Sequence, residues 1–175
     1  MANNRIQLLT GLILIMLVMA PACASDGLSN LSKVTVSEFA WSNWGASRED
    51  MQLSREDAMA RYNYCPTGGC VVRLESVEVK PSRAFKGETL TLATTYTILT
   101  PEQLAIPISI SREVFFQGKS LGRTKDYDAR NFNGTWTQRA DFPLPANAAP
   151  GIYSIVTRVN TAYGSDQKTL EFSVQ

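Results

Sequence analysis

The sequence predicts a mainly β protein: an antiparallel β-sandwich of about seven strands that follows an N-terminal extension containing a short helix. From Val71 onward, short runs rich in β-branched and aromatic residues alternate apolar with polar positions, as half-buried strands do. Turn residues separate these runs, and no helical pattern comes between them, which excludes a parallel α/β sheet. The predicted strands lie at 71–79, 90–98, 106–116, 136–144, 153–163 and 169–174.

The N-terminus has the pattern of an export signal. Arg5 precedes an apolar run from Leu8 to Ala20, and Pro21 ends that run. The run is shorter than the ~20 residues that a membrane-spanning helix needs. A basic start, an apolar stretch and small residues at its exit are typical of a secretory signal peptide. We therefore expect residues 1–24 to be a signal peptide and the mature protein to be exported.

Two ways of processing this signal are open. Ordinary signal peptidase would cut before Ser25, because Ala22 and Ala24 are small residues at the required spacing. Alternatively, the Ala-Pro-Ala-Cys sequence that ends at Cys23 resembles a bacterial lipobox. This resemblance implies lipidation of Cys23 and membrane attachment, at the outer membrane because Ala24 is not the aspartate associated with inner-membrane retention. The expected location is the periplasm or the outer membrane.

Two cysteines remain after either processing route, Cys65 and Cys70, on the two sides of a Pro-Thr-Gly-Gly turn. Exported proteins meet an oxidising compartment, in which paired thiols usually form disulfides. This turn chemistry can bring the two Cα atoms within the roughly 4.4–6.8 Å that a disulfide requires. The chain has no histidine, so structural zinc lacks ligands. We expect a structural disulfide at the junction with the sandwich, with a redox-active pair or free thiols as alternatives.

The tetrad Ser-Arg-Glu-Asp occurs twice in the predicted extension, residues 25–70, starting at Ser47 and at Ser54. In each copy an acid follows the serine by three residues, as in a capping box, so both serines are predicted N-caps. Apolar residues follow the second copy at helical spacing: Ala58, Met59 and Tyr62. We predict a helix from about Arg55 to Tyr64 that packs this face on the sandwich.

Several motifs near the C-terminus support a family resemblance. Pro150 and Gly151 precede Tyr153 at the start of a predicted strand, a Gly-containing turn follows, and the chain ends in a Leu-x-Phe-x-Val strand. Together with the Lys-Gly-Glu motif before the strand at 90–98, these motifs resemble those of bacterial immunoglobulin-like domains over residues 71–175. The resemblance implies an immunoglobulin-like sandwich in which Tyr153 is the buried corner tyrosine and Pro150-Gly151 forms the turn before it.

Composition argues against several kinds of site. Without histidine, Ser-His and Cys-His nucleophilic mechanisms are excluded. The 17 basic and 16 acidic residues are interspersed, so no basic stripe suggests a nucleic-acid partner. The densest group of oxygen ligands lacks the spacing of a calcium loop and is predicted to be a solvated loop; it consists of Asp126, Asp128, Asn131 and Asn133. We predict no enzyme activity, no metal and no cofactor.

The tryptophans allow two interpretations. Trp41, Trp44 and Trp136 could be ligand-facing aromatics that form a sugar-binding platform. Alternatively they are buried, because rings of this size dominate core energetics. We favour burial and expect Trp41 and Trp44 to join the contact between the helix and the sandwich.

Three function classes follow from these predictions. The first, which we favour, is a non-enzymatic cell-envelope protein whose immunoglobulin-like module binds another envelope protein or scaffolds an assembly. The second is a carbohydrate-binding module. The third is a periplasmic chaperone or inhibitor that acts by strand addition at an open sheet edge. Pro107, Arg112 and Glu113 argue against the third class, because prolines and charges protect edge strands.

Overall fold

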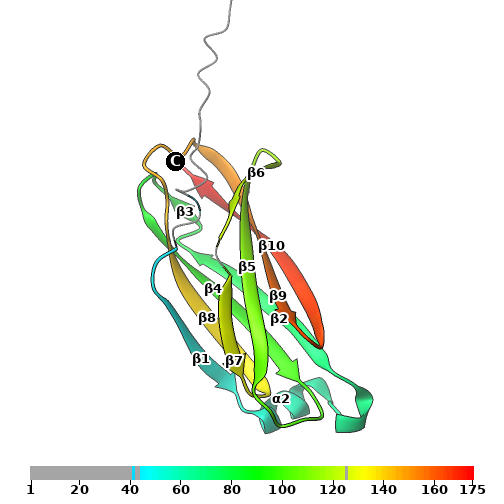
Figure 1. The fold of residues 1–175 in the computed structure, drawn as a ribbon. Coiled ribbons are helices and arrows are strands. Elements are labelled where there is room, and N and C mark those ends of the chain that lie inside the picture. The colour runs from blue at the N-terminus through cyan, green and yellow to red at the C-terminus, as the bar shows by residue number, and fades with distance from the viewer. Residues whose placement is uncertain (1–40, 42–43, 125) are drawn as a thin grey trace, which may run out of the picture. The chain divides into compact units, whose positions relative to one another are not determined.

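The computed structural model describes residues 41, 44–124 and 126–175, all of which belong to one compact unit, Thr35–Gln175 (Figure 1). The predicted signal peptide, the lipobox-like motif and Cys23 lie outside the described residues. Within the described part, no helix is long and apolar enough to cross a membrane.

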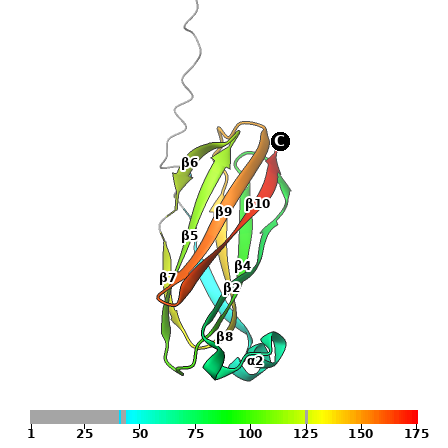
Figure 2. The same cartoon turned by 90° about the vertical axis from the view of Figure 1, so that its right-hand side faces the viewer.

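Two sheets pack face to face in this unit, which confirms the predicted β-sandwich (Figures 1 and 2). In spatial order, the first sheet contains β1 (Ser47–Leu53), β8 (Gly134–Pro143), β4 (Thr89–Leu99) and β2 (Val71–Lys80). The second contains β3 (Arg83–Ala84), β10 (Gly164–Val174), β9 (Gly151–Thr161), β5 (Ile106–Phe116) and β6 (Lys119–Arg123). A further strand, β7 (Tyr127–Asn131), pairs with the first half of β5. All predicted strands are present, and β1, β3, β6 and β7 are additional.

The interior of the sandwich consists of two apolar clusters separated by a polar layer. One cluster contains Leu92, Val114 and Ile155, and the other contains Tyr96, Ile110 and Val159, among others. Between them in the strand register, Thr94 lies opposite Gln138 in the first sheet. At the same level of the second sheet, Arg112 lies opposite Thr157. All four of these polar side chains are buried.

The first Ser-Arg-Glu-Asp tetrad forms a strand, so the prediction that Ser47 caps a helix is wrong. β1 pairs antiparallel with β8, from Ser47 opposite Ala140 to Leu53 opposite Thr135. Arg139 of β8 also binds the Asp50 carboxylate at 2.9 Å. The backbone hydrogen bonds of a whole strand outweigh one helix cap. The sandwich therefore includes residues that the sequence pattern assigns to an extension.

The second tetrad does begin a helix, α2 (Arg55–Tyr62). The Ser54 hydroxyl accepts a hydrogen bond from the backbone N–H of Asp57 at 3.2 Å, as the predicted N-cap requires. The helix ends at Asn63, which adopts a left-handed conformation with φ 51°. Ala58 is fully buried, and the helix packs on β8, β4 and β1. A helix this short persists because of that packing.

The interpretation of the strand at 106–112, with Pro107, Arg112 and Glu113, as an edge strand is wrong. β5 is an interior strand, with β9 on one side and β6 and β7 on the other. Arg112 points into the core and is only 3% exposed. The Arg112 charge therefore belongs to the interior polar layer and does not protect a sheet edge from pairing with another chain.

Candidate interaction surface

Three chain connections meet at one end of the sandwich, which we call the loop end (Figures 1 and 2). It comprises residues 100–105 between β4 and β5, 132–133 between β7 and β8, and 162–163 between β9 and β10. Glu102 joins all three connections. Its carbonyl accepts a hydrogen bond from the Asn133 amide at 2.9 Å, and its carboxylate accepts one from the Tyr163 hydroxyl at 2.8 Å.

Asn133 holds two of these connections in place from inside. Its side chain, 3% exposed, accepts a hydrogen bond from the Thr100 N–H at 3.1 Å and donates one to the Thr100 carbonyl at 2.9 Å. The prediction that Asn133 is a solvated loop residue is therefore wrong. This hydrogen bonding ties the β7–β8 connection to the backbone at the start of the β4–β5 connection.

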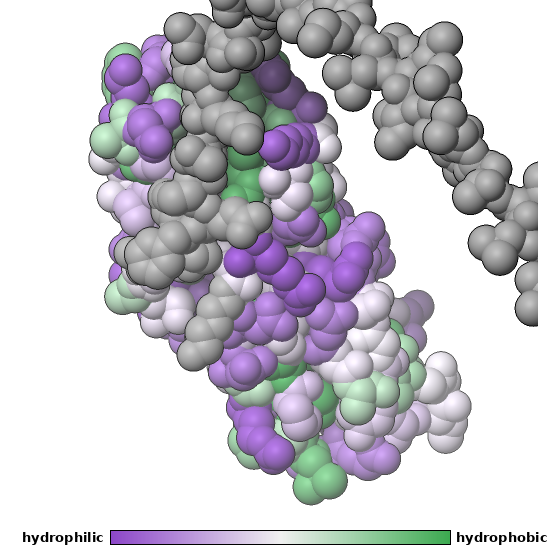
Figure 3. Space-filling view, turned by 45° about the horizontal axis from the view of Figure 1, so that its top comes forward, coloured by the Kyte–Doolittle hydropathy of each residue, from purple (hydrophilic) through white to green (hydrophobic). Residues whose placement is uncertain are grey.

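The loop end exposes large apolar side chains. Leu104 is 68% exposed, Phe132 is 58% exposed and Tyr163 is 41% exposed, one on each of the three connections. Figure 3 shows apolar residues at this lower end, beyond a mainly hydrophilic band. Single exposed apolar residues are normal on protein surfaces, but these three lie on connections that hydrogen bonds of Glu102 link to one another.

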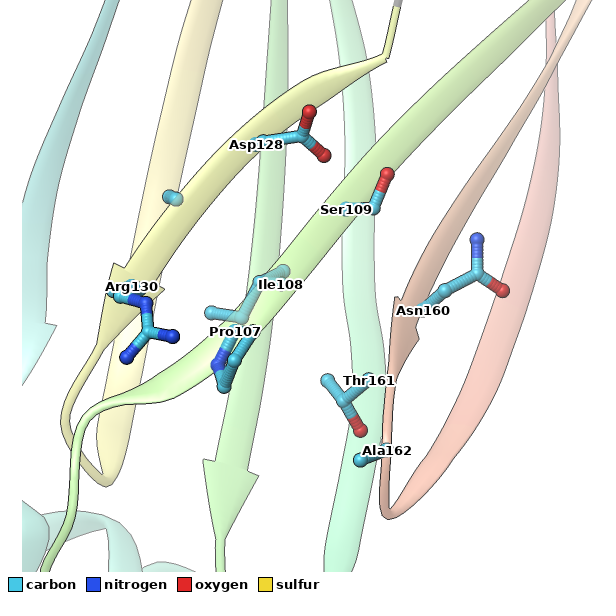
Figure 4. Close-up of a pocket in the computed structure, with 9 residues that line it drawn as sticks. Pro107, Ile108, Ser109, Asp128, Arg130, Asn160, Thr161 and Ala162 are labelled. Atoms are coloured by element: carbon cyan, nitrogen blue, oxygen red, sulfur yellow. The ribbon is translucent and has the colours of Figure 1, made fainter.

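A shallow groove on the outer face of the second sheet continues from the loop end (Figure 4). Its volume is about 640 Å³. Pro107 and Ser109 of β5 lie between Asp128 and Arg130 of β7 on one side and Asn160 of β9 on the other. The small side chains of β5, flanked by longer ones, make the depression. Such a surface suits an extended polypeptide segment better than an enclosed small molecule.

The candidate oxygen ligands between 126 and 133, which the sequence predicts to be a solvated loop, do not converge on one site. Asn131 is buried and donates a hydrogen bond to the Tyr96 hydroxyl at 2.8 Å, so it too is not a solvated loop residue. Asp126 binds Arg123 at 3.3 Å, and Asp128 is exposed on β7. Among the described residues no cluster of three or more acidic or cysteine side chains could hold a metal ion.

Tyr96 belongs to a buried network that joins the two sheets. Its hydroxyl donates to the carboxylate of Glu49 on β1, and Tyr127 on β7 lies 3.4 Å from the other oxygen of that carboxylate. Burial, followed by the hydrogen bond to Glu49, raises the pKa of Tyr96 far above its usual range. The Tyr96 phenol stays protonated and donates to Glu49, and these hydrogen bonds stabilise the contact between β1 and β7. This constellation is structural.

The three tryptophans do not form a platform. Trp41 is 1% exposed and stacks on Tyr153, with ring centroids 5.2 Å apart. Trp44 is half-buried and stacks on Phe142 at 4.6 Å. Trp136 packs against the other core cluster and donates its indole N–H to the Phe132 carbonyl at 2.9 Å. The expectation that Trp41 and Trp44 pack with the helix is wrong, because they pack against the ends of β8 and β9 instead.

Trp44 covers the buried cation of the polar layer. The Arg112 guanidinium lies 5.2 Å from the Trp44 ring centroid. It donates hydrogen bonds to Thr94 at 2.9 Å and to Gln138. Burial lowers the pKa of Arg112 to about 10. None of the ion pairs among the described residues involves Arg112. The neutral side chains of Thr94 and Gln138 and the Trp44 ring therefore take the place of the water that would surround an exposed guanidinium.

Tyr153 has the environment of a corner tyrosine. Its ring is 1% exposed, and its hydroxyl donates to the Ala149 carbonyl at 2.8 Å. Burial raises the pKa of Tyr153, and the hydrogen bond to Ala149 opposes this effect. At Gly151, after Pro150, φ is +146° and a Cβ would meet the Phe116 ring at 2.8 Å. Only glycine fits this turn without displacing that ring.

Cys65 and Cys70 are free and exposed in this structure, on the two sides of the 3₁₀ turn η1 (Pro66–Gly68). The Gly68 N–H donates to the Cys65 carbonyl at 2.7 Å, which closes the turn. The disulfide therefore stays a prediction.

Sequence patterns missed the loop end altogether. Leu104, Phe132 and Tyr163 stand alone in their segments, and the hydrogen bonds between Glu102, Asn133 and Tyr163 link the connections that carry them. A weak signal was present at Leu104 and Phe132, which lie between the predicted strands, whereas Tyr163 was placed at the end of the strand predicted over 153–163.

No protein-family model matches this sequence, and no curated protein matches it. Among solved structures, it is similar to an alkylpurine DNA glycosylase from Pseudomonas fluorescens bound to DNA, at 15% identity and a TM-score of 0.43, over 59% of this chain and 30% of that one. It is also similar to a β-glucosidase from Listeria innocua, at 14% identity and a TM-score of 0.42, over 60% of this chain and 16% of that one. A third similar structure is the CARDB domain of a Pyrococcus furiosus protein, at 14% identity and a TM-score of 0.41, over 62% of this chain and 90% of that one.

The matched region is therefore less than a third of the first two proteins. Similarities this distant carry no information about function.

Proposed function

We propose that this chain is a non-enzymatic, exported cell-envelope protein that binds another envelope protein through the loop end of an immunoglobulin-like sandwich. The observation that carries the proposal is the convergence of Leu104, Phe132 and Tyr163 on connections that Glu102 and Asn133 hold in place. Exposed apolar patches with polar surroundings mark protein-interaction sites. A surface fixed before binding also loses less conformational entropy when a partner docks.

The strand order supports the immunoglobulin-like assignment. Immunoglobulin sandwiches have strands A, B, E and D in one sheet and C, F and G in the other. Here β2, β4, β8 and β1 are neighbours in that order, and so are β5, β9 and β10. β1 thus takes the place of strand D. In variable domains the B–C and F–G loops bind antigen, and Leu104 and Tyr163 lie on the corresponding connections.

The place where the chain enters the sandwich also supports this proposal. Trp41 contacts Phe142 at the far end of β8, whereas Phe132 and Asn133 directly precede the start of that strand. A strand of ten residues is roughly 33 Å long. An anchor before Trp41, such as a lipidated Cys23, would join the sandwich at the end away from Leu104, Phe132 and Tyr163. The loop end would then be free to meet a partner.

Strand addition is less well supported. β1 is an edge strand, and among the described residues it pairs only with β8. Its sequence contains Arg48, Glu49 and Asp50, and such charges discourage the pairing of an edge with another chain. A carbohydrate platform is also less well supported, since Trp41 is in the core and Trp44 and Trp136 pack against different clusters.

Capture from envelope extract tests the proposed function. The bait is the mature protein, and the test variant is Leu104→Ser/Phe132→Ser/Tyr163→Ser. The control variant is Phe85→Ser/Ile152→Ser, because these side chains are 65% and 64% exposed near the other end of the sandwich. We expect partner capture to fall at least tenfold for the loop-end variant, in line with hot-spot losses of about 2 kcal/mol or more, and to persist for the control. Equal capture by both variants would contradict the proposal.

A further inference from the structure

The two thiols lie on a short, exposed segment between α2 and β2. Cys65 and Cys70 are both exposed, and the η1 turn between them folds the chain back through the hydrogen bond from Gly68 to Cys65. Gly69, next to Cys70, has a φ of +97°. The Tyr64 hydroxyl donates to the Gly69 carbonyl at 2.6 Å and so bridges the segment. A change at either sulfur therefore acts directly on this small loop.

This segment lies next to the loop end. The hydrogen bond to Glu102 raises the pKa of the Tyr163 phenol, burial and the Glu102 charge add to the rise, and the Cys70 thiolate contributes as well. For Tyr64, burial raises the pKa of the phenol and Cys70 contributes next. The geometry agrees: a Cβ at Gly164, which follows Tyr163, would lie 3.9 Å from the side chain of Val72, two residues after Cys70. Cys70 is thus near Tyr163, one of the three exposed side chains of the proposed binding surface. This proximity is tertiary, because residues 65–70 and the β9–β10 turn are far apart in the sequence.

We infer that Cys65 and Cys70 form an accessible dithiol that closes reversibly into a disulfide, and that this closure changes binding at the loop end. The regulation rests on the function proposed for the loop end. Its chemistry is thiol–disulfide exchange with a small-molecule or protein disulfide as the oxidant. Exposed pairs of this kind are the labile ones, whereas buried structural disulfides resist reduction.

The exchange has two steps. One protein thiolate attacks the oxidant and forms a mixed disulfide, releasing the first oxidant thiol. The second protein thiolate then attacks the protein sulfur of that mixed disulfide and releases the other oxidant thiol. The two protein thiols thereby lose two electrons and two protons, and one oxidant disulfide becomes two thiols. Cys65 is the better first nucleophile, because hydrogen bonds from the side chain and backbone of Thr67 lower its pKa.

Closure has two consequences for the loop end. It removes the Cys70 thiolate from the neighbourhood of Tyr163 and Tyr64, which should lower the pKa of both phenols. It also draws Cys70 toward Cys65 and so moves Gly69, whose carbonyl holds the Tyr64 hydroxyl. The surface around Tyr163 should therefore differ between the dithiol and the disulfide.

The test compares the reduced mature protein with the same protein treated with glutathione disulfide. Thiol labelling and intact mass should show loss of both thiols and of two hydrogen atoms on oxidation, and recovery with dithiothreitol. Phenol titration by absorbance should move to lower pH on oxidation, and Tyr163→Phe should remove part of that movement. Capture of the envelope partner should change at least about fivefold, the lower range of coupling between sites. The Cys65→Ser/Cys70→Ser variant should respond to neither treatment.

Two results would overturn the inference. One is that both thiols remain fully labelled after the oxidant treatment. The other is that the disulfide forms but leaves both the phenol titration and the capture unchanged. If capture is equal in the two redox forms yet lost in the loop-end variant, the regulation is wrong and the proposed function stands. If the loop-end variant captures as well as the unmodified protein, the proposed function itself is contradicted.

Discussion

The indole ring of Trp41 stacks on the phenol ring of Tyr153, with their centroids 5.2 Å apart and an angle of 26° between the rings. Phe142 contacts the same indole at 5.8 Å. A residue that precedes the first described strand therefore completes the core at the end opposite the loop end. Trp41 itself therefore belongs to the core of the sandwich, although the sequence pattern assigns it to the extension.

Replacing Trp41 should destabilise the protein strongly. Trp41→Ala removes a fully buried ring, and large aromatic truncations cost about 3–5 kcal/mol. Urea unfolding of the mature protein measures this loss. Trp44→Phe is the matched control, because it keeps an aromatic ring on Phe142 and should cost much less. A Trp41→Ala midpoint equal to that of the unmodified protein would place Trp41 outside the core.

Tyr153 contributes to folding stability in two separable ways, through its hydroxyl and through its ring. Tyr153→Phe keeps the ring but leaves the Ala149 carbonyl without its donor, which should cost about 1 kcal/mol. Tyr153→Ala also removes the ring that Trp41, Phe116 and Phe172 contact, and should cost about 3–5 kcal/mol. Thermal and urea unfolding of the pair distinguish the two effects. Equal losses for both variants would show that the ring contributes nothing beyond the hydroxyl.

The polar layer should respond non-additively to substitution. Arg112→Met removes the donor of Thr94 and Gln138 and leaves buried acceptors unsatisfied, at a cost of about 1–3 kcal/mol. Arg112→Met/Thr94→Val/Gln138→Leu should recover most of that loss, because an apolar layer replaces a buried charge with few partners. A double-mutant-cycle analysis of urea midpoints measures the coupling. A triple variant that loses the sum of the single losses would contradict this account.

Glu75 should make the docking of α2 depend on pH. Burial raises the pKa of Glu75, but hydrogen bonds from Thr97 and Tyr62 and the charges of Arg61 and Arg73 outweigh it, so the net pKa lies below its usual value. The unfolded state therefore binds more protons than the folded state as the pH falls below the unfolded pKa of about 4.3. The contribution of the Glu75 carboxylate to the free energy of unfolding is therefore present above that pH, and it is lost as the pH falls through the pKa of Glu75 in the folded protein.

Substitution of Glu75 tests this pH dependence. Glu75→Gln should be less stable than the unmodified protein at pH 7, and the difference should shrink below about pH 4. Glu78→Gln, an exposed position on the same strand, is the matched control and should change stability little. Urea unfolding across this pH range measures the difference. A Glu75→Gln difference that stays constant with pH would exclude the carboxylate as its source.

The six longer strands from residue 71 onward (β2, β4, β5, β8, β9 and β10) could be predicted because their period-two pattern is local and repeated. β1 could not, because its Ser-Arg-Glu-Asp start satisfies the rule for a helix cap equally well. Tertiary structure decided between the two: the same tetrad pairs with β8 at Ser47 and begins α2 at Ser54. β6 and β7 are short and mostly polar, so no apolar alternation identifies them.

The candidate binding surface could not be predicted, because no local pattern describes it. Leu104, Phe132 and Tyr163 come from three different connections, and the hydrogen bonds made by Glu102 and Asn133 unite them. The burial of Arg112 could not be predicted for a related reason. A charged residue in a strand usually marks an exposed position, and only the facing Thr94 and Gln138 make its burial tolerable.

Site-specific photo-crosslinking in intact cells tests the central claim, that the loop end is the binding surface, most directly. A photoreactive phenylalanine analogue replaces Leu104 in one strain and, as a control, Phe85 in another, because both side chains are well exposed but lie near opposite ends of the sandwich. Irradiation should link the Leu104 variant to one envelope protein of defined mass, and the Phe85 variant should give no such product. Crosslinking of the same protein from Phe85, with none from Leu104, would contradict the account.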